Sequence, residues 1–213
     1  YGNSFMHILR GEFELALQNA KGGESLDPTP VNIAHLNSIR AMANWKLGNE
    51  EEAVKNMANA LPILRSLPPQ VYSLLVSYRI LCHITFEMWE QGKTFNVPGW
   101  RTTAEIHKTI AVLQKMFRKF KPAFPIGEPS LLFYRGLQKW MHGKKEAAQK
   151  DWLASVQSAK RHSMPWEEAN TLREIGKRSE GTVRKANLEK ALVLFTSCQA
   201  LYDMADTKRL LEK

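Results

Sequence analysis

Cysteine is scarce in this sequence, with only Cys82 and Cys198 among 213 residues. Two thiols so far apart along the chain form neither a disulfide framework nor a zinc site, because both need several cysteines or closely spaced ligands. Each lies in an apolar stretch and is typical of a small buried side chain in a reducing compartment. We therefore expect a cytoplasmic protein.

Long uncharged hydrophobic runs are also missing. The most apolar segment, residues 71–89, contains Arg79 and His83. Ionisable side chains inside such a segment favour a buried helix over a membrane span. The chain begins with Tyr1 rather than Met, and residues 4–9 are typical of the end of a helix. These features predict a fragment of a longer protein.

Charge is not concentrated in one tract. Lys and Arg number 30 against 21 for Asp and Glu, a net charge of +9 that is spread along the chain in short basic pairs. A positive net charge attracts acidic peptides, anionic membranes or nucleic acid. Basic pairs mixed with glutamate are more typical of solvated helix faces.

Catalytic motifs are missing as well. Gly92-Lys93-Thr94 ends like a phosphate-binding loop, but Glu87 stands where the first glycine is needed and no strand precedes it. The six histidines lack metal-ligand spacing, and no serine lies in a Gly-x-Ser-x-Gly turn. We expect no catalytic site, cofactor or metal in this segment.

No segment alternates like a strand, and the sequence predicts an all-α fold. Proline and glycine clusters divide it into helices, because proline lacks an amide hydrogen and excludes helical geometry just before it. The expected breaks are residues 25–30, 67–69, 96–99, 122–129, 164–165 and 179–181.

A pattern of small residues recurs within these segments. Glycines at 11, 48 and 143 are each followed five residues later by alanine, at 16, 53 and 148. Four residues after each alanine comes a residue that fills space, namely Ala20, Met57 or Trp152. Three residues after that comes a small residue, namely Gly23, Ala60 or Ser155. Such a glycine closes a first helix in left-handed geometry, and the alanine allows the second helix to approach closely.

This pattern resembles the tetratricopeptide repeat, a helix–turn–helix unit of about 34 residues. Gly136 supplies the small residue that the family has inside a first helix, and Gly176 does so in the last unit, whose turn is longer than the family's. A truncated unit precedes these, and a degenerate unit with an insertion around Val97–Trp100 spans residues 71–120. The resemblance implies a right-handed superhelix of about five hairpins, with residues 1–213 forming a single repeat domain.

Three tryptophans share one position, three residues before a turn glycine; they are Trp45, Trp89 and Trp140. Equivalent positions of stacked hairpins align, so we expect a column of tryptophans. In tetratricopeptide arrays the first helices line a groove that holds a peptide or partner helix. The residues expected to face it are Met42, Trp45, Arg79, Phe86, Trp89, Phe133, Leu137, Trp140, Arg173 and Lys177.

This surface is aromatic in its middle and basic at its far end, which suits an apolar segment with an acidic flank. The alternative is that the tryptophans only wedge adjacent hairpins together, as large residues at repeat spacing usually do. Chaperone-binding members of the family hold a terminal carboxylate with Lys, Asn and Arg. Here Ser38 and Met42 occupy the corresponding surface, which argues against that use.

Residues 164–211 have a narrower resemblance, carried by Met164-Pro165-Trp166, Ile175-Gly176, residues 191–195 and residues 205–211. They are similar to the helical tail that follows the ATPase module in large signalling proteins, including soluble class III adenylyl cyclases and related kinases and transcription regulators. We therefore expect an interaction scaffold within a signalling protein, or else a regulatory arm of an enzyme whose catalysis lies upstream.

A nucleic-acid-binding array is the third alternative. Lys115, Arg118, Lys119 and Lys121, interleaved with Phe117 and Phe120, offer charge for phosphates. The same spacing is typical of an amphipathic helix whose phenylalanines pack inward, and this interpretation is the favoured one.

Overall fold

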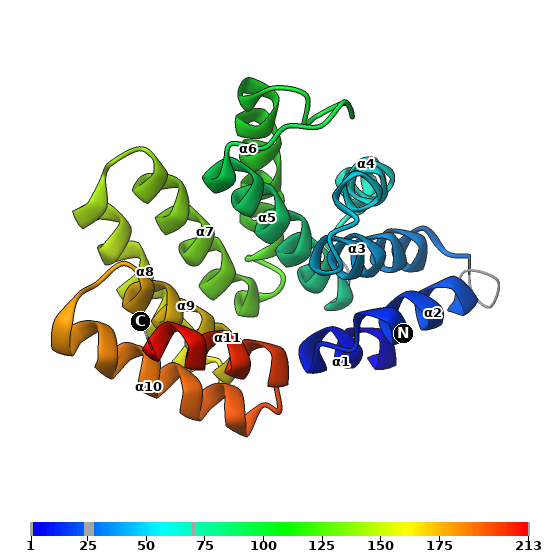
Figure 1. Ribbon diagram of the computed structural model, residues 1–213. Helices are drawn as coiled ribbons and strands as arrows, with labels where there is room; N and C mark the ends of the chain where they lie inside the picture. Colours follow the sequence, from blue (N-terminus) through cyan, green and yellow to red (C-terminus); the bar gives the residue numbers. More distant parts are fainter. Residues whose placement is uncertain (1, 24–27, 70, 213) are drawn as a thin grey trace. The chain divides into compact units, whose positions relative to one another are not determined.

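The computed structural model describes residues 2–23, 28–69 and 71–212 (Figure 1). Within these residues the chain forms eleven α-helices and one short 3₁₀ helix, with no strand, so the prediction of an all-α fold is confirmed. The helices are α1 (Gly2–Arg10), α2 (Phe13–Gly23), α3 (Pro30–Lys46), α4 (Glu50–Ser66), α5 (Ser73–Gln91), α6 (Thr103–Phe120), η1 (Pro125–Gly127), α7 (Glu128–Met141), α8 (Lys145–Arg161), α9 (Pro165–Lys177), α10 (Gly181–Ser197) and α11 (Leu201–Leu211).

The chain divides into two compact units. Unit 1 comprises Tyr1–Ile8 and Glu12–Phe124, and unit 2 comprises Leu9–Gly11 and Pro125–Lys213. We describe each unit by itself, and the expectation of a single repeat domain over residues 1–213 stays a prediction.

In unit 1, helix α3 packs against α2, α4 and α5, and α5 packs against α6. The core contains fully buried aliphatic side chains such as Ile39 and Leu75. Tyr78 of α5 meets Phe117 and Phe120 of α6 edge to face, at 5.7 and 5.8 Å between ring centroids. The inward packing predicted for these two phenylalanines is therefore confirmed.

In unit 2, each helix packs against the next, from α7 through α8, α9 and α10 to α11. One core cluster joins α8, α9 and α10 and includes Val156, Leu172 and Phe195. Residues 164–211, which carry the resemblance to signalling-protein tails, form α9, α10 and α11.

The turn glycines adopt the left-handed geometry that the sequence predicts. Gly11, Gly48 and Gly143 have φ of 78°, 82° and 76°, and Gly92 has φ of 65°. After each glycine, the next amide donates to the carbonyl five residues back, as from Asn49 to Asn44 at 2.9 Å. This bond satisfies a carbonyl at the helix end, and it requires a left-handed residue before the donor.

Two further helix ends use the same geometry without glycine, and sequence reasoning missed both. Ser163 and Gln199 have φ of 52° and 54°. The following amides, of Met164 and Ala200, donate to carbonyls five residues back at 2.9 and 3.0 Å. The left-handed position therefore recurs after α8 and α10 even though a side chain makes it less favourable there.

Small residues lie where paired helices meet. Ala16, Ala53 and Ala148 are completely buried, as the spacing predicts. A Cβ atom on Gly136 of α7 would lie 2.4 Å from Trp152 Nε1 of α8, and one on Gly176 of α9 would lie 2.7 Å from Leu188 Cγ of α10. These separations are shorter than van der Waals contact, so both pairings depend on the absence of a side chain.

The predicted breaks separate the helices, but residues 25–27 of the first one lie outside the described residues. The expected insertion is an ordered loop, residues 92–102. Trp100 is buried within it, and its amide donates to Val97 at 3.0 Å. Gly181, in the break between α9 and α10, begins α10 with φ of 54°.

Candidate protein-binding surface

The first helices of the hairpins, α3, α5, α7 and α9, carry all ten residues predicted to face a groove. In unit 1, the side chains of Met42, Trp45, Arg79 and Phe86 are buried, and that of Trp89 is half-buried. Four of these five positions therefore serve the packing of unit 1, and only Trp89 keeps a substantial accessible part.

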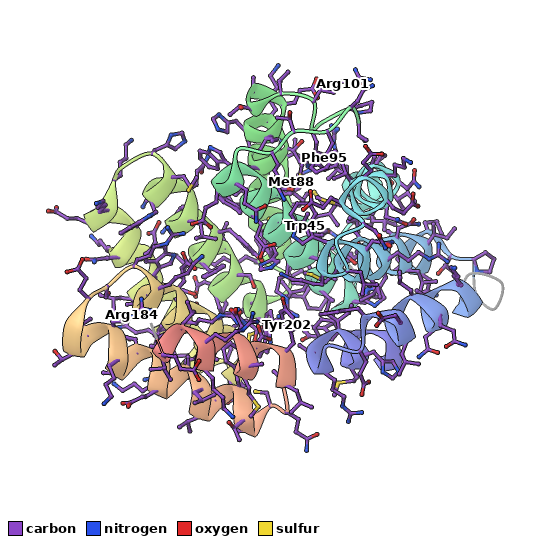
Figure 2. The ribbon with its side chains drawn as sticks, in the orientation of Figure 1. Trp45, Met88, Phe95, Arg101, Arg184 and Tyr202 are labelled. Carbon is purple, nitrogen blue, oxygen red and sulfur yellow. The ribbon has the colours of Figure 1, made fainter. Side chains whose placement is uncertain are left out.

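Trp45 packs against the following hairpin. Its ring lies edge-on to Phe95 of the 92–102 loop, at 6.3 Å between centroids, and Lys93 Nζ lies 5.8 Å from its centre (Figure 2). Its indole N–H donates to Glu87 of α5. Lys93 also pairs with Glu50 at the start of α4, at 2.5 Å. Trp45 thus lies between α3, α5 and the loop, as the wedge alternative predicts.

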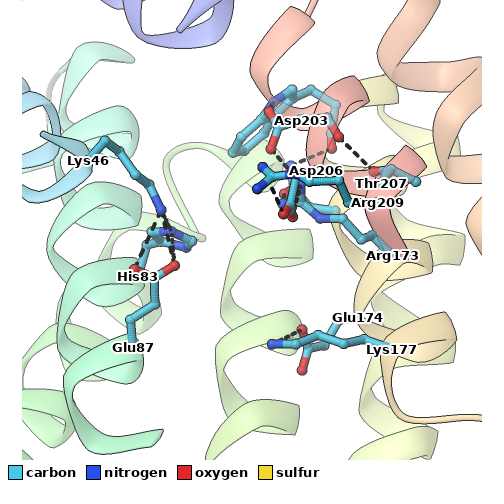
Figure 3. A network of polar contacts seen from close by, with 12 residues as sticks. Lys46, His83, Glu87, Arg173, Glu174, Lys177, Asp203, Asp206, Thr207 and Arg209 are labelled. Atoms are coloured by element: carbon cyan, nitrogen blue, oxygen red, sulfur yellow. Dashed lines mark hydrogen bonds and ion pairs between the residues drawn. The ribbon is translucent and has the colours of Figure 1, made fainter. Parts of the chain in front are cut away.

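A polar network joins α3 to α5 beside Trp45 (Figure 3). Glu87 accepts from Lys46 Nζ at 3.1 Å and pairs with His83 Nε2 at 2.9 Å. Lys46 Nζ also lies 3.3 Å from the same histidine nitrogen. Burial alone raises the pKa of Glu87, but His83, Lys46 and the Trp45 N–H outweigh it and hold that pKa well below its ordinary value.

Sequence reasoning missed this network. His83 and Glu87 are separated by one helical turn, which is a signal for a pair on one face, whereas Lys46 comes from another hairpin. The side chains of Lys46, His83 and Glu87 keep 14%, 33% and 27% of their surface exposed. The network is therefore accessible to a ligand.

Arg79 and Trp89, on α5, have different surroundings. The Arg79 guanidinium lies 5.8 Å from the ring centre of Phe5 in α1. The Trp89 ring contacts Phe86 at 5.9 Å and His107 of α6 at 4.4 Å between centroids. Trp89 thus contacts side chains of its own hairpin, α5 and α6, whereas Trp45 of α3 contacts side chains of the following hairpin. The expected column of tryptophans stays a prediction.

In unit 2, three predicted residues of α7, Phe133, Leu137 and Trp140, are half-buried. Trp140 packs on Trp152 of α8 at 5.6 Å between centroids. Lys145 Nζ and the Arg178 guanidinium carbon each lie 5.4 Å from the centre of the Trp140 ring. Cations over the face of an indole are attracted by its quadrupole, so this aromatic surface is flanked by positive charge.

The expected basic end on α9 is mostly neutralised. Arg173 Nη1 lies 2.7 Å from Asp203 and 3.5 Å from Asp206, both on α11 (Figure 3). Trp166 Nε1 also donates to Asp203, at 3.0 Å. Lys177 is exposed and lies 4.0 Å from Glu174. Sequence reasoning took α9 alone and did not foresee that α11 brings carboxylates to Arg173.

A second ion-pair network in unit 2 was also missed. The buried carboxylate of Asp151 on α8 accepts from Arg135 at 2.6 and 2.7 Å and pairs with Lys139 at 2.6 Å. Burial raises the pKa of Asp151, but the two cations of α7 outweigh it and lower that pKa. These ion pairs therefore join α7 to α8.

These arrangements offer binding chemistry. The accessible groups are half-buried aromatic rings such as Trp89 and Trp140, partly exposed cations such as Lys46, and the Glu87 carboxylate, which already contacts Lys46 and His83. Across the described residues, no group of three or more His, Cys, Asp or Glu side chains is placed to hold a metal ion. Nor is any described helix long and apolar enough to cross a bilayer. No family model matches the chain, and no curated protein matches it either.

Proposed function

We propose that this chain is a tetratricopeptide-like right-handed superhelix that serves as a protein-interaction scaffold. The observation that supports it best is the repetition of one local structure. Helix ends at Gly11, Gly48, Gly92 and Gly143 share left-handed geometry and the same long-range turn hydrogen bond. Repeated units of this kind bury their apolar faces by stacking and present equivalent first-helix positions to a partner.

The ligand in this proposal is a segment of another protein or of a neighbouring domain in the same chain. Trp89 and Trp140 contribute apolar area that is partly accessible. Aromatic side chains give large contact area at a low cost in conformational entropy. Lys145 beside Trp140 favours an acidic flank in the segment. Arg178 lies beside the same ring, but its Nε is paired with Glu174 at 2.7 Å. Arg173 does not add to that preference, because Asp203 and Asp206 neutralise it.

A regulatory arm of a multidomain signalling enzyme is the second proposal. It is supported by residues 164–211, where the similarity to the tails of such proteins coincides with three consecutive packed helices. In that case the ligand is a domain of the parent chain, and the full-length sequence would place a nucleotide-cyclising or kinase domain before Tyr1.

Peptide selection tests the scaffold proposal. A library of random peptides displayed on phage is selected on the purified chain, and the affinities of the enriched peptides are measured by fluorescence anisotropy. We expect a shared apolar core with flanking Asp or Glu. Trp89→Ala and Trp140→Ala together should weaken binding about tenfold or more, which is the typical cost of truncating an interface anchor.

The matched control is Leu153→Ala, because Leu153 lies on α8, a second helix, and is 59% exposed. Circular dichroism checks that each variant remains folded. If the selected peptides bind the double tryptophan variant and the wild type equally well, the first helices do not form the ligand surface and the proposal is wrong.

A further inference from the structure

Helix α6 differs from the other long second helices in its exposed charges. Residues 101–121 contain six basic residues and a single acidic one, Glu105. The Glu105 carboxylate accepts from the backbone amides of Gly99 and Arg101 at 2.9 and 3.1 Å, at the start of the helix. Beyond its first turn, α6 is therefore a cationic helix without a counter-charge of its own.

Three of the cations, Lys108, Lys115 and Lys119, lie along one line of the exposed face, and Arg118 lies about 100° around the helix from Lys119. This α6 stripe consists of Lys108, Lys115, Arg118 and Lys119, all exposed. Within the described part of the chain, no ion pair or hydrogen bond joins Lys115, Arg118 or Lys119 to another side chain. By contrast, the cations Arg135 and Lys139 share the carboxylate of Asp151.

The stripe has no aromatic or large apolar component. Met116, Phe117 and Phe120 are buried against the core of unit 1; the exposed apolar residues of α6 are Ala104 and Ala111, and Val112 is half-buried. Single-stranded nucleic acid needs aromatic side chains on which bases stack. A membrane-bound helix needs large apolar groups that enter the lipid. Neither is present on this face.

The spacing of the cations suits a helical partner. With a rise of about 1.5 Å per residue, Lys115 lies about 10 Å beyond Lys108, and Lys119 about 6 Å beyond Lys115. Carboxylates that repeat along one face of an α-helix have the same separations. Ala104 and Ala111 alternate with the lysines on this face and leave room for a second helix to approach closely.

We propose that the α6 stripe docks an acidic α-helical segment of a partner protein. This surface belongs to a second helix and is independent of the first-helix residues discussed above, so it goes beyond the proposed scaffold function. Binding rests on charge pairs between exposed side chains. It is therefore weak to moderate and sensitive to salt.

Two designed peptides of identical composition test this proposal. Both are capped and alanine-rich; one carries its glutamates on a single helical face, and the other distributes them around the helix. We expect the one-faced peptide to bind the chain at least about fivefold more tightly at low salt. We expect its affinity to fall about tenfold or more in the Lys115→Glu/Arg118→Glu/Lys119→Glu variant.

The control variant Lys144→Glu/Lys150→Glu/Lys190→Glu changes the net charge equally at exposed lysines outside α6. It should retain most of the affinity. Charge reversal near the end of α6 also opposes the helix dipole. A Lys115→Gln/Arg118→Gln/Lys119→Gln variant, checked by circular dichroism, therefore keeps the test valid if the reversed variant does not fold.

Three results would overturn the proposal. Equal affinity for the two peptides would show that spacing is irrelevant, and equal loss in both reversed variants would show a response to net charge only. Tighter binding to duplex DNA, or to vesicles containing phosphatidylserine, than to the one-faced peptide would assign the stripe to phosphate groups instead. Since the scaffold test uses Trp89 and Trp140, the two proposals can fail separately.

Discussion

Units 1 and 2 bring paired helices together with different side chains. In unit 2, α7 and α8 meet through Gly136, against which the Trp152 indole lies, and a turn of three residues joins them. In unit 1, α5 and α6 have no such glycine. An eleven-residue loop joins them, and Trp100 from that loop fills the space beside Thr85 of α5, with its N–H 3.4 Å from the hydroxyl oxygen.

The difference shows two ways of stabilising a helix pair: a glycine in the interface, as at Gly136, or a large side chain from the connecting loop, as at Trp100. A glycine allows close approach, so that the partner helix supplies the bulk. Where the helices have no such glycine, a large side chain from the connecting loop fills the space, because protein interiors do not leave space empty. The resemblance to a repeat family depends on the first arrangement, which is why the hairpin of α5 and α6 was the least regular in sequence.

The largest expected effect is in unit 1, at Trp100. Its side chain is 1% exposed, and Trp100→Ala leaves a cavity where the loop meets α5 and α6. We expect the free energy of unfolding to fall by about 3–5 kcal/mol, the usual cost of truncating a buried tryptophan. Urea denaturation followed by circular dichroism measures it. A loss below about 1 kcal/mol would show that the loop does not stabilise the hairpin.

The corresponding change in unit 2 adds volume. Gly136→Ala places a Cβ 2.4 Å from Trp152 Nε1, and the indole must move from its hydrogen bond to the Phe133 carbonyl. We expect a loss of about 1–3 kcal/mol in the free energy of unfolding, although alanine favours a helix more than glycine does.

Gly22→Ala in α2 is the matched control, because nothing lies within 4 Å of a Cβ at that position. It should be neutral or stabilising. Trp152→Phe in the Gly136→Ala background removes the indole nitrogen that lies closest to the new methyl group and should recover part of the loss. If the two changes are additive, Gly136 and Trp152 are not coupled in the way that the geometry indicates.

The units also differ in their response to pH. His35 of α3, in unit 1, is buried, with Nδ1 3.4 Å from Ser77 Oγ of α5, and burial lowers its pKa from 6.5 to about 4. The unfolded chain therefore binds a proton in a range where the folded chain does not. Burying His35 in its neutral form therefore carries no cost of deprotonation above pH 6.5. As pH falls from 6.5 toward 4, protonation of this histidine in the unfolded chain lowers the free energy of unfolding.

Between pH 7 and pH 5 we expect unit 1 to lose about 2 kcal/mol through His35. Unit 2 loses the contribution of Asp151 only in more acidic solution, because the pKa of that carboxyl is lowered from 3.8. Hydrogen exchange resolved by peptide reports the two units separately. His35→Gln should remove most of the change in unit 1, and an unchanged pH dependence in that variant would contradict the assignment.

Sequence patterns predicted much of the backbone but little of the side-chain chemistry. The left-handed helix ends at Gly11, Gly48 and Gly143 were predictable because a positive φ strongly favours glycine. The close approach at Gly136 was predictable from repeat spacing. Local periodicity specifies such features, so no tertiary information was needed.

The candidate surface was less predictable because its polar groups come from separate helices. The resemblance placed Trp45 and Arg173 on first helices. It did not predict that Glu87 contacts Trp45 or that Asp203 pairs with Arg173. Both pairs join residues at least thirty positions apart. A single sequence holds no signal for such contacts when the charges are common on all helices, so the pairing of Arg173 with α11 could not be predicted.

The smallest expected effect concerns helix ends in unit 2 that lack glycine. Ser163 and Gln199 hold φ of 52° and 54°, where Gly48 and Gly92 of unit 1 have glycine. Ser163→Gly should raise the free energy of unfolding by about 0.5–1 kcal/mol, because glycine adopts this geometry without a steric penalty from Cβ. Gly48→Ala, with open space around its Cβ, should lower it by about 1 kcal/mol. Urea midpoints of the two variants measure both changes. If Ser163→Gly is destabilising, the serine side chain contributes more to this turn than its backbone geometry costs.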